Sequence, residues 1–188
     1  AGCRLDRLGE LAGRMRNTTD RMDKVFQEFL YMSKPVADKP ETMDLCACVR
    51  DCVSLLQPRL EQAKVNVRLD LPPEAVRVSG YENAIRRALM NVITNAEQFS
   101  PEGGVITIRL ARSDGEAGLD VMDSGPGIPE AQQKRIFDMF VTTRPGGTGL
   151  GLFLARAAIE KCGGTIRVMN RPEGGACFRV ALPLVGPK

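Results

Sequence analysis

The chain has 188 residues, of which 43% are hydrophobic, 5% are aromatic and none is tryptophan, and its formal net charge is +3. This length suits one ordinary domain, or a domain with an appendage, and can bury a hydrophobic core. No dense basic run marks a nucleic-acid-binding arm, so no nucleic-acid partner is expected. No apolar run reaches the ~20 residues of a membrane span, and no signal peptide opens the chain. We expect a cytoplasmic fragment that begins at Ala1. The parent protein could be anchored in a membrane.

Six cysteines occur, and we expect free thiols in a reducing compartment. Three fall in a stretch with helical periodicity and three are scattered: Cys46, Cys48 and Cys52, then Cys3, Cys162 and Cys177. With no histidine and no CxxC pair, this spacing does not favour a zinc site.

A long amphipathic helix is predicted within residues 1–36. Apolar or small residues recur at alternating spacings of three and four, at Leu5, Leu8, Ala12, Met15, Thr19, Met22, Phe26 and Phe29. Such a seam requires a partner of similar length, so we expect pairing outside this domain, in a coiled coil or four-helix bundle. Packing of one amphipathic helix on its own domain is the alternative. Ser33-Lys34-Pro35 ends the helix, because proline disrupts its continuation.

Residues 37–188 have the pattern of an α+β domain. After a polar link, VADKPETMD, helices are predicted over residues 45–63, over 81–99 and from Leu150 onward. Strands are predicted over residues 65–71, 104–111, 118–122, 165–170 and 177–184. The last two strands flank the loop RPEGGA and pair locally, so the sheet is at least partly antiparallel. Helices gathered on one face of it give a two-layer sandwich.

The helix at 81–99 separates apolar from polar side chains. Its apolar stripe is Ile85, Leu89, Val92 and Ala96, and its polar stripe is Arg87, Asn91, Asn95 and Gln98. An amide carbonyl can ligate Mg²⁺ while phosphate oxygens and water complete the shell, so two asparagines on one face suit a hard cation. On its own, this stripe is more typical of solvated surface.

The segment DSGPGIP begins where an apolar strand ends. Asp123 there can accept a hydrogen bond from an exocyclic amine, and Ile128 offers an apolar wall. The two glycines allow the backbone to approach a flat ligand. Taken alone, the heptapeptide is more typical of a tight turn with a solvated aspartate.

Four glycines crowd the helix start in PGGTGLGLFLARAAIEK: Gly146, Gly147, Gly149 and Gly151. A glycine inside a helix costs about 1 kcal/mol relative to alanine, so we expect Gly149 and Gly151 to cost ~2 kcal/mol together. Free backbone N–H groups ahead of a helix N-terminus form an anion cradle. Neither a Walker sequence nor a dinucleotide fingerprint after a strand occurs, so the cradle belongs to another nucleotide fold, unless it is only a glycine-rich turn.

Four segments together resemble motifs of sensor histidine kinases. NVITNAEQFSP, DSGPGIP, IFDMF and GGTGLGL are similar to the N box, first glycine box, phenylalanine box and second glycine box, in that order. The short lid VTTRPGGTGLGL is most similar to the nitrogen-regulation type, and DRMDKVFQEFLYMSKP resembles the second helix of a dimerisation and phosphoacceptor hairpin. The resemblance implies a partial hairpin over residues 1–36 and a catalytic ATP-binding domain of the Bergerat type over 37–188.

The resemblance also implies roles for matching residues. Asn95 would ligate Mg²⁺, Asn91 would support the metal or phosphates, and Asp123 would read the adenine amine. The other implied positions are Gly125, Gly127 and Ile128 around adenine, Gly147, Thr148, Gly149, Leu150 and Gly151 at the β- and γ-phosphates, Arg144 where related lids carry lysine, and Phe137 and Phe140 as lid anchors.

Three departures accompany the resemblance. Gln98 replaces a frequent lysine, Ala176 replaces a frequent hydroxyl near adenine, and the chain has no histidine. The resemblance implies ATP and Mg²⁺ as cofactors, homodimerisation through the N-terminal helix, and a response-regulator receiver domain as partner. Because the chain has no histidine, we expect the phosphoacceptor histidine upstream of this chain.

Four alternatives remain open at this point. The chain could belong to a pseudokinase or scaffold, or to a kinase that acts on a separate acceptor protein. It could be a serine kinase of the anti-sigma type, which would not need the heptad seam. Gyrase-type and heat-shock-type ATPases share the motif set but carry a glutamate, the general base for water, where this chain has Asn91.

Overall fold

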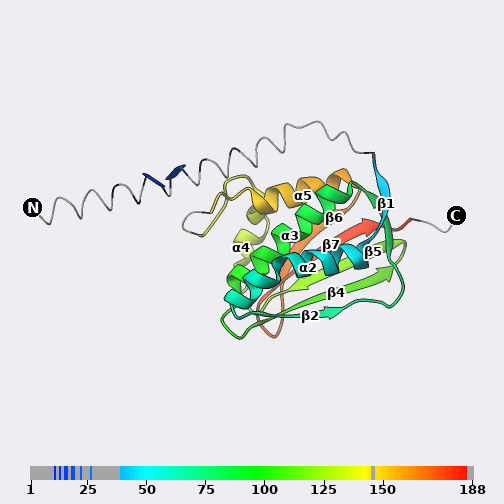
Figure 1. Ribbon diagram of the computed structural model, residues 1–188, viewed down its shortest axis with the longest axis horizontal. Helices are drawn as coiled ribbons and strands as arrows, with labels where there is room; N and C mark the ends of the chain where they lie inside the picture. The colour runs from blue at the N-terminus through cyan, green and yellow to red at the C-terminus, as the bar shows by residue number, and fades with distance from the viewer. Residues whose placement is uncertain are drawn as a thin grey trace, which may run out of the picture.

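The computed structural model describes residues 39–144 and 147–185, with scattered positions between Leu11 and Phe26. A five-stranded sheet forms one layer of the domain (Figure 1). Its strands follow the order β2-β4-β5-β7-β6, with bounds β2 Asn66–Asp70, β4 Val105–Ser113, β5 Glu116–Met122, β6 Thr165–Asn170 and β7 Ala176–Pro183. β2 and β4 run parallel, and the other neighbours are antiparallel, β6 and β7 included. The expected mixed sheet is confirmed.

The second layer consists of α2 (Leu45–Gln62), α3 (Glu82–Phe99) and α5 (Gly151–Lys161), which cover one face of the sheet (Figure 1). The predicted apolar stripe of α3 is completely buried. It belongs to the same core as the inward-facing residues of the sheet, among them Ile108, Leu119 and Phe178. Burial of about 25 cal/mol per Å² of apolar surface drives the two layers together. The predicted two-layer α+β sandwich is confirmed.

A second, two-stranded sheet was not predicted. β1 (Glu41–Asp44) pairs antiparallel with β3 (Arg77–Gly80), so the interpretation of residues 41–44 as part of a polar link is wrong. Asp44 also caps α2, because its Oδ1 accepts hydrogen bonds from the backbone N–H groups of Cys46 (3.0 Å) and Val76 (3.1 Å). β1 has only Met43 buried, so its sequence lacks the apolar alternation that reveals a strand.

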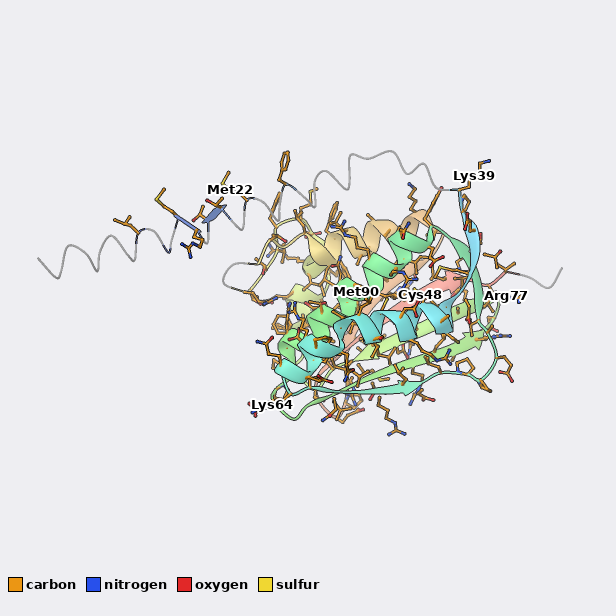
Figure 2. All side chains as sticks on the ribbon, in the orientation of Figure 1. Met22, Lys39, Cys48, Lys64, Arg77 and Met90 are labelled. Atoms are coloured by element: carbon orange, nitrogen blue, oxygen red, sulfur yellow. The ribbon has the colours of Figure 1, made fainter. Side chains whose placement is uncertain are left out.

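The described cysteines are free thiols. Those of α2 are buried in the core, and Figure 2 shows Cys48 on that helix. Burial raises the pKa of Cys177 to about 11. Cys3 lies outside the described residues.

The predicted N-terminal seam is described at a few positions only. Met15, Thr19, Met22 and Phe26 are helical and exposed; the other seam residues lie outside the described residues. Pairing of this segment with a partner stays a prediction. No helix in the described part of the chain has the length and apolar character to cross a membrane.

Candidate functional site

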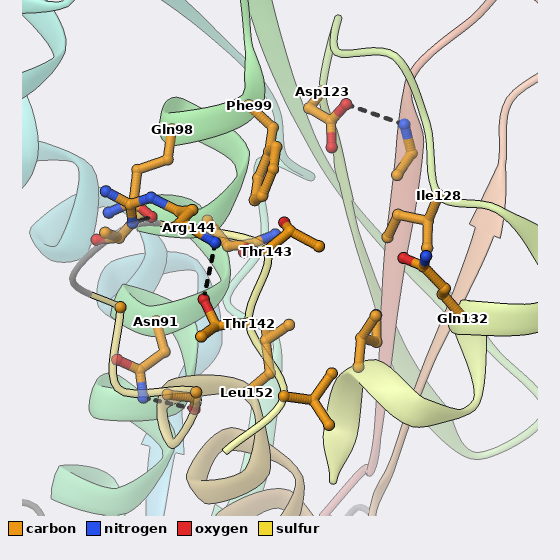
Figure 3. Close-up of a pocket in the computed structure, with 18 of the residues that line it drawn as sticks. Asn91, Gln98, Phe99, Asp123, Ile128, Gln132, Thr142, Thr143, Arg144 and Leu152 are labelled. Carbon is orange, nitrogen blue, oxygen red and sulfur yellow. Dashed lines mark hydrogen bonds between the residues drawn. The ribbon is translucent and has the colours of Figure 1, made fainter. Parts of the chain in front are cut away.

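A cavity of about 520 Å³ lies where four parts of the chain meet (Figure 3). α3 contributes Asn91, Thr94, Asn95, Gln98 and Phe99; the turn after β5 and the helical turn that follows contribute Asp123, Pro126, Gly127, Ile128, Pro129, Gln132 and Ile136; the segment leading into α5 contributes residues 141–144, 147–149, 151 and 152; Ala176 of β7 completes the lining. The N box and both glycine boxes therefore border one space.

Asp123 is the one buried charged residue in the described part of the chain, with 2% of its surface exposed. Its Oδ1 accepts hydrogen bonds from the backbone N–H groups of Gly125 and Ala176, each at 2.9 Å. Its Oδ2 has no hydrogen-bond partner among the described residues, and the carboxylate borders the cavity (Figure 3). The side chain is thus an oriented acceptor with one oxygen left for a ligand.

Two glycines after Asp123 are required by close packing. A Cβ on Gly125 would lie 2.6 Å from the carbonyl oxygen of Phe99. Gly127 has φ +77°, and a Cβ there would lie 2.9 Å from Oδ1 of Asn170. Gly127 and Ile128 line the cavity, whereas Gly125 shapes the turn from behind.

The polar face of α3 borders the opposite side of the cavity. The Asn91 side-chain amide donates a 2.9 Å hydrogen bond from Nδ2 to the carbonyl oxygen of Gly151, which leaves its Oδ1 as an acceptor. Asn95 lies one turn further along and also lines the cavity. Among the described residues no group of three His, Cys, Asp or Glu side chains could hold a metal. Two amides fit a Mg²⁺ ion whose remaining ligands come from phosphate and water.

The segment before α5 is built around Gly149. Gly149 has φ +70°, a Cβ there would lie 2.5 Å from the carbonyl carbon of Phe140, and its carbonyl oxygen accepts a 3.0 Å hydrogen bond from the N–H of Phe140. Because α5 begins at Gly151, Gly149 lies outside the helix. The expectation that Gly149 weakens the helix is therefore wrong, since a left-handed residue favours glycine.

Other parts of this segment differ in their steric demands. A Cβ on Gly147 would lie 2.5 Å from Oγ1 of Thr142. At Gly151 the nearest atoms to a Cβ belong to Asn91 at 3.7 Å, an ordinary contact. The Leu150 N–H donates to Oγ1 of Thr148 at 3.3 Å, and Leu150 is itself buried rather than lining the cavity. Gly146 lies outside the described residues.

Arg144 reaches from this segment to α3. Its Nη1 donates a hydrogen bond to Oε1 of Gln98, and both residues line the cavity. Arg144 is the one cationic side chain among the described lining residues. A lysine at position 98 would bring two cations together, so Gln98 and Arg144 form a compatible pair.

The two phenylalanines expected as lid anchors behave differently. Phe137 is buried and packs edge-on against Phe178, with ring centroids 6.4 Å apart at 82°. Phe140 is 64% exposed and has φ +64°, so its ring does not anchor the segment in this structure; its backbone N–H does, through Gly149. The prediction for Phe140 is corrected accordingly.

Several lining residues were not predicted. Apolar ones are Phe99, Ile136, Val141 and Leu152, and polar ones are Thr94, Gln132, Thr142 and Thr143. Phe99, Ile136 and Leu152 belong to or adjoin the four motifs, so their apolar character was a usable signal. The threonines carry no pattern that separates them from surface residues.

Residues 80–186 match the family model described as "Histidine kinase-, DNA gyrase B-, and HSP90-like ATPase". The chain belongs to this family. Among curated relatives, this histidine kinase-like domain is 34% identical over 166 residues to the signal transduction histidine-protein kinase AtoS of Escherichia coli, covering 88% of this chain and 27% of that protein. It is 36% identical over 178 residues to the sensor protein KdpD of the same organism, covering 93% and 20%. The chain thus spans only 27% and 20% of the length of these two relatives.

Solved structures share the fold of this histidine kinase-like domain. The mycobacterial sensor histidine kinase MprB aligns with a TM-score of 0.72 and 28% identity, covering 79% of this chain and 100% of that one. Histidine kinase ThkA, solved in complex with the response regulator protein TrrA, aligns with a TM-score of 0.78 and 27% identity, covering 90% and 49%. The resemblance to sensor histidine kinase catalytic domains is confirmed, and membership of this ATPase family implies ATP binding.

Proposed function

We propose that the chain binds Mg-ATP in this cavity as the catalytic part of a sensor histidine kinase. It would transfer the γ-phosphoryl group to a histidine outside the given sequence, from which an aspartate of a response regulator would receive it. The observation that carries the proposal is the buried carboxylate of Asp123, which borders the cavity and whose Oδ1 is held by two backbone N–H groups.

The adenine would lie at the Asp123 end of the cavity. Oδ2 can accept a hydrogen bond from the exocyclic 6-amine, and a charged acceptor makes that bond about twice as strong as a neutral one. Ile128, Ile136 and Leu152 supply apolar surface for the flat faces of the base. Gly125 and Gly127 keep the turn close to this space.

The triphosphate would lie between α3 and the start of α5. The helix N-terminus offers unpaired N–H groups and a positive partial charge, and the absence of a side chain at Gly151 leaves that backbone accessible. Arg144, held by Gln98, adds a positive charge. Asn95 and Oδ1 of Asn91 would hold the Mg²⁺ ion, which neutralises phosphate charge when bound.

Near α3 the described lining of the cavity contains no carboxylate, and this favours phosphoryl transfer over ATP hydrolysis. Asp123 is the one carboxylate among the described lining residues, and it lies at the end of the cavity that we assign to adenine. Asn91 cannot accept a proton, and its Nδ2 is engaged with Gly151. Without a general base for water, ATP hydrolysis would be slow, and transfer of the γ-phosphoryl group would depend on an acceptor outside the given sequence.

Response-regulator partnership is supported by the ThkA–TrrA complex among the similar structures. Homodimerisation through residues 1–36 would place the acceptor hairpin beside this domain, and the alternating apolar spacing of that segment supports it. The resemblance of the lid to the nitrogen-regulation type forms part of the same proposal.

Two experiments test the proposal. Calorimetric titration with Mg-ATP should give one site per chain. If the wild-type protein does not bind Mg-ATP, the kinase proposal is contradicted and the scaffold alternative is favoured. Incubation with γ-labelled ATP and a separately expressed hairpin that carries the parent protein's histidine should yield acid-labile, alkali-stable phosphate on the hairpin. Label in acid-stable phosphoserine would favour the anti-sigma type, and steady release of inorganic phosphate would favour an ATPase.

A further inference from the structure

The loop between β6 and β7, residues 171–175, packs behind Asp123. The backbone of Asp123 is held from this side twice: its N–H donates to the carbonyl oxygen of Ala176 at 2.9 Å, and its carbonyl oxygen accepts from Nη1 of Arg171 at 2.8 Å. Gly175 has φ +85°, and a Cβ there would collide with the same carbonyl oxygen. The loop is therefore fitted to one position of the Asp123 backbone.

The residue before Arg171 holds the apolar wall. The Asn170 side chain accepts a hydrogen bond from the Ile128 N–H at Oδ1 (2.8 Å) and donates one from Nδ2 to the Ile128 carbonyl oxygen (2.9 Å). The Asn170 side chain thereby engages both backbone groups of Ile128, much as a neighbouring strand would, and the carbonyl oxygen also accepts from Nε2 of Gln133 at 3.1 Å. Asn170, the last residue of β6, and Arg171, the first residue of the loop, thus fix the two residues assigned to the nucleobase.

We propose that Arg171 and Asn170 are positioning residues of the nucleobase site: Arg171 sets its selectivity for a 6-aminopurine, and Asn170 holds its apolar wall. This inference rests on the proposed function, because it assigns the Asp123 end of the cavity to adenine. Arg171 would hold the Asp123 backbone, and with it the carboxylate, at the distance that the 6-amine requires. Asn170 would keep Ile128 against the face of the same ring.

The setting of Arg171 argues against a purely stabilising role. Its Nη2 pairs with Oε1 of Glu173 at 2.6 Å, and this hydrogen bond lowers the pKa of Glu173. Its Nε, however, is buried without a hydrogen-bond partner among the described residues. A buried unpaired donor is unfavourable, and such groups concentrate where geometry serves a function.

Selectivity separates this role from general stability. A hydrogen bond depends steeply on distance and angle, whereas apolar contact with the base and charge contact with phosphates tolerate small displacements. Loss of Arg171 should therefore weaken recognition of the 6-amine and leave binding of the rest of the nucleotide intact.

The test compares ATP with purine riboside triphosphate, which lacks the 6-amine, both with Mg²⁺ in calorimetry. The wild-type chain should prefer ATP by about tenfold or more, since a hydrogen bond to a charged group contributes that much. In R171M this preference should fall below about threefold, while affinity for purine riboside triphosphate stays within about twofold. N170D keeps the acceptor for the Ile128 N–H but places a carboxylate oxygen against the Ile128 carbonyl, and should weaken both nucleotides.

The matched control is R179M. Arg179 lies on β7 and pairs with Asp120 through Nε (2.6 Å) and Nη2 (2.7 Å), and it is absent from the cavity lining. Its replacement should leave the preference unchanged. An unchanged preference in a folded R171M, or an equal loss of affinity for both nucleotides in that variant, would overturn the inference. If R171M does not fold, N170D still tests the wall that Asn170 holds, and wild-type affinity of N170D for both nucleotides would overturn the inference. Wild-type protein that binds neither nucleotide would overturn the proposed function and this inference with it.

Discussion

The side-chain amide of Asn91 donates a 2.9 Å hydrogen bond to the carbonyl oxygen of Gly151, and so joins the middle of α3 to the first residue of α5. This bond sets the orientation of the Asn91 amide and leaves its Oδ1 available as an acceptor. The same residue therefore joins two helices and, in the proposed function, would present an oxygen to the metal ion beside the α5 N-terminus. Asn91 therefore has both a structural contact and a proposed role in metal binding.

Replacement of Asn91 by alanine should lower the free energy of unfolding by about 1 kcal/mol, since one intramolecular hydrogen bond is lost. It should also weaken Mg-ATP binding, because the carbonyl near the metal is lost with it. Urea unfolding and calorimetry measure the two effects. Q62A, at an exposed position at the end of α2, is the control and should stay within about 0.5 kcal/mol. Unchanged affinity in N91A would contradict the role in nucleotide binding.

Substitution of Gly149 and of Gly151 by alanine should have opposite effects on stability. G149A forces a left-handed backbone on alanine beside Phe140 and should cost at least about 1–2 kcal/mol in urea unfolding. G151A has room for its methyl group and should leave stability unchanged or raise it by up to about 1 kcal/mol.

Mg-ATP affinity distinguishes the second variant further. If phosphate approaches the backbone at Gly151, G151A should bind at least about tenfold more weakly despite its intact fold. A stable G151A with wild-type affinity would place the phosphates elsewhere.

Phe137 and Phe140 should differ sharply in thermal and urea unfolding. F137A removes a buried ring from its contact with Phe178 and should cost about 3–5 kcal/mol. F140A removes a mostly exposed ring and should change the free energy of unfolding by about 0.5 kcal/mol or less. Similar losses in the two variants would mean that the Phe140 ring packs in solution.

Cys177 should make stability depend on pH in the alkaline range. Burial raises its pKa in the folded state to about 11, from 9.0 for an unperturbed thiol. The unfolded chain loses the proton first, so the stabilisation is fully present below about pH 9 and is lost as pH rises through about 11. The difference in unfolding free energy between wild type and C177A should shrink by roughly 2 kcal/mol over that range. A constant difference would show that the thiol is not shielded.

Much of the fold could be predicted because most elements carry their own signal. The apolar stripe of α3 and the alternation in β4 and β5 depend on local periodicity, and these elements formed within two residues of expectation. β1 could not be found in this way, because its strand character comes from pairing with β3. Periodicity reports burial, and β1 buries only Met43.

The sequence predicted the motifs that line the site, but not the residues that hold those motifs in place. Asp123 and Asn95 stand in recognisable segments, whereas Asn170 and Arg171 act through hydrogen bonds to residues more than forty positions away. Gly149 shows a related limit: sequence alone placed it inside a helix, and only its φ of +70° reveals a left-handed position. Long-range partners and backbone angles have no local signature.

The most direct test of nucleotide recognition is calorimetric titration of wild type and D123N with Mg-ATP. In D123N, Oδ1 can still accept from Gly125 and Ala176, so the fold should persist, as a thermal unfolding curve would verify. The amide Nδ2 would then occupy the place of Oδ2 and oppose the adenine amine, donor against donor. We predict one Mg-ATP site in the wild type and no detectable binding in D123N. Equal affinity in the two proteins would contradict the assignment of Asp123 to adenine.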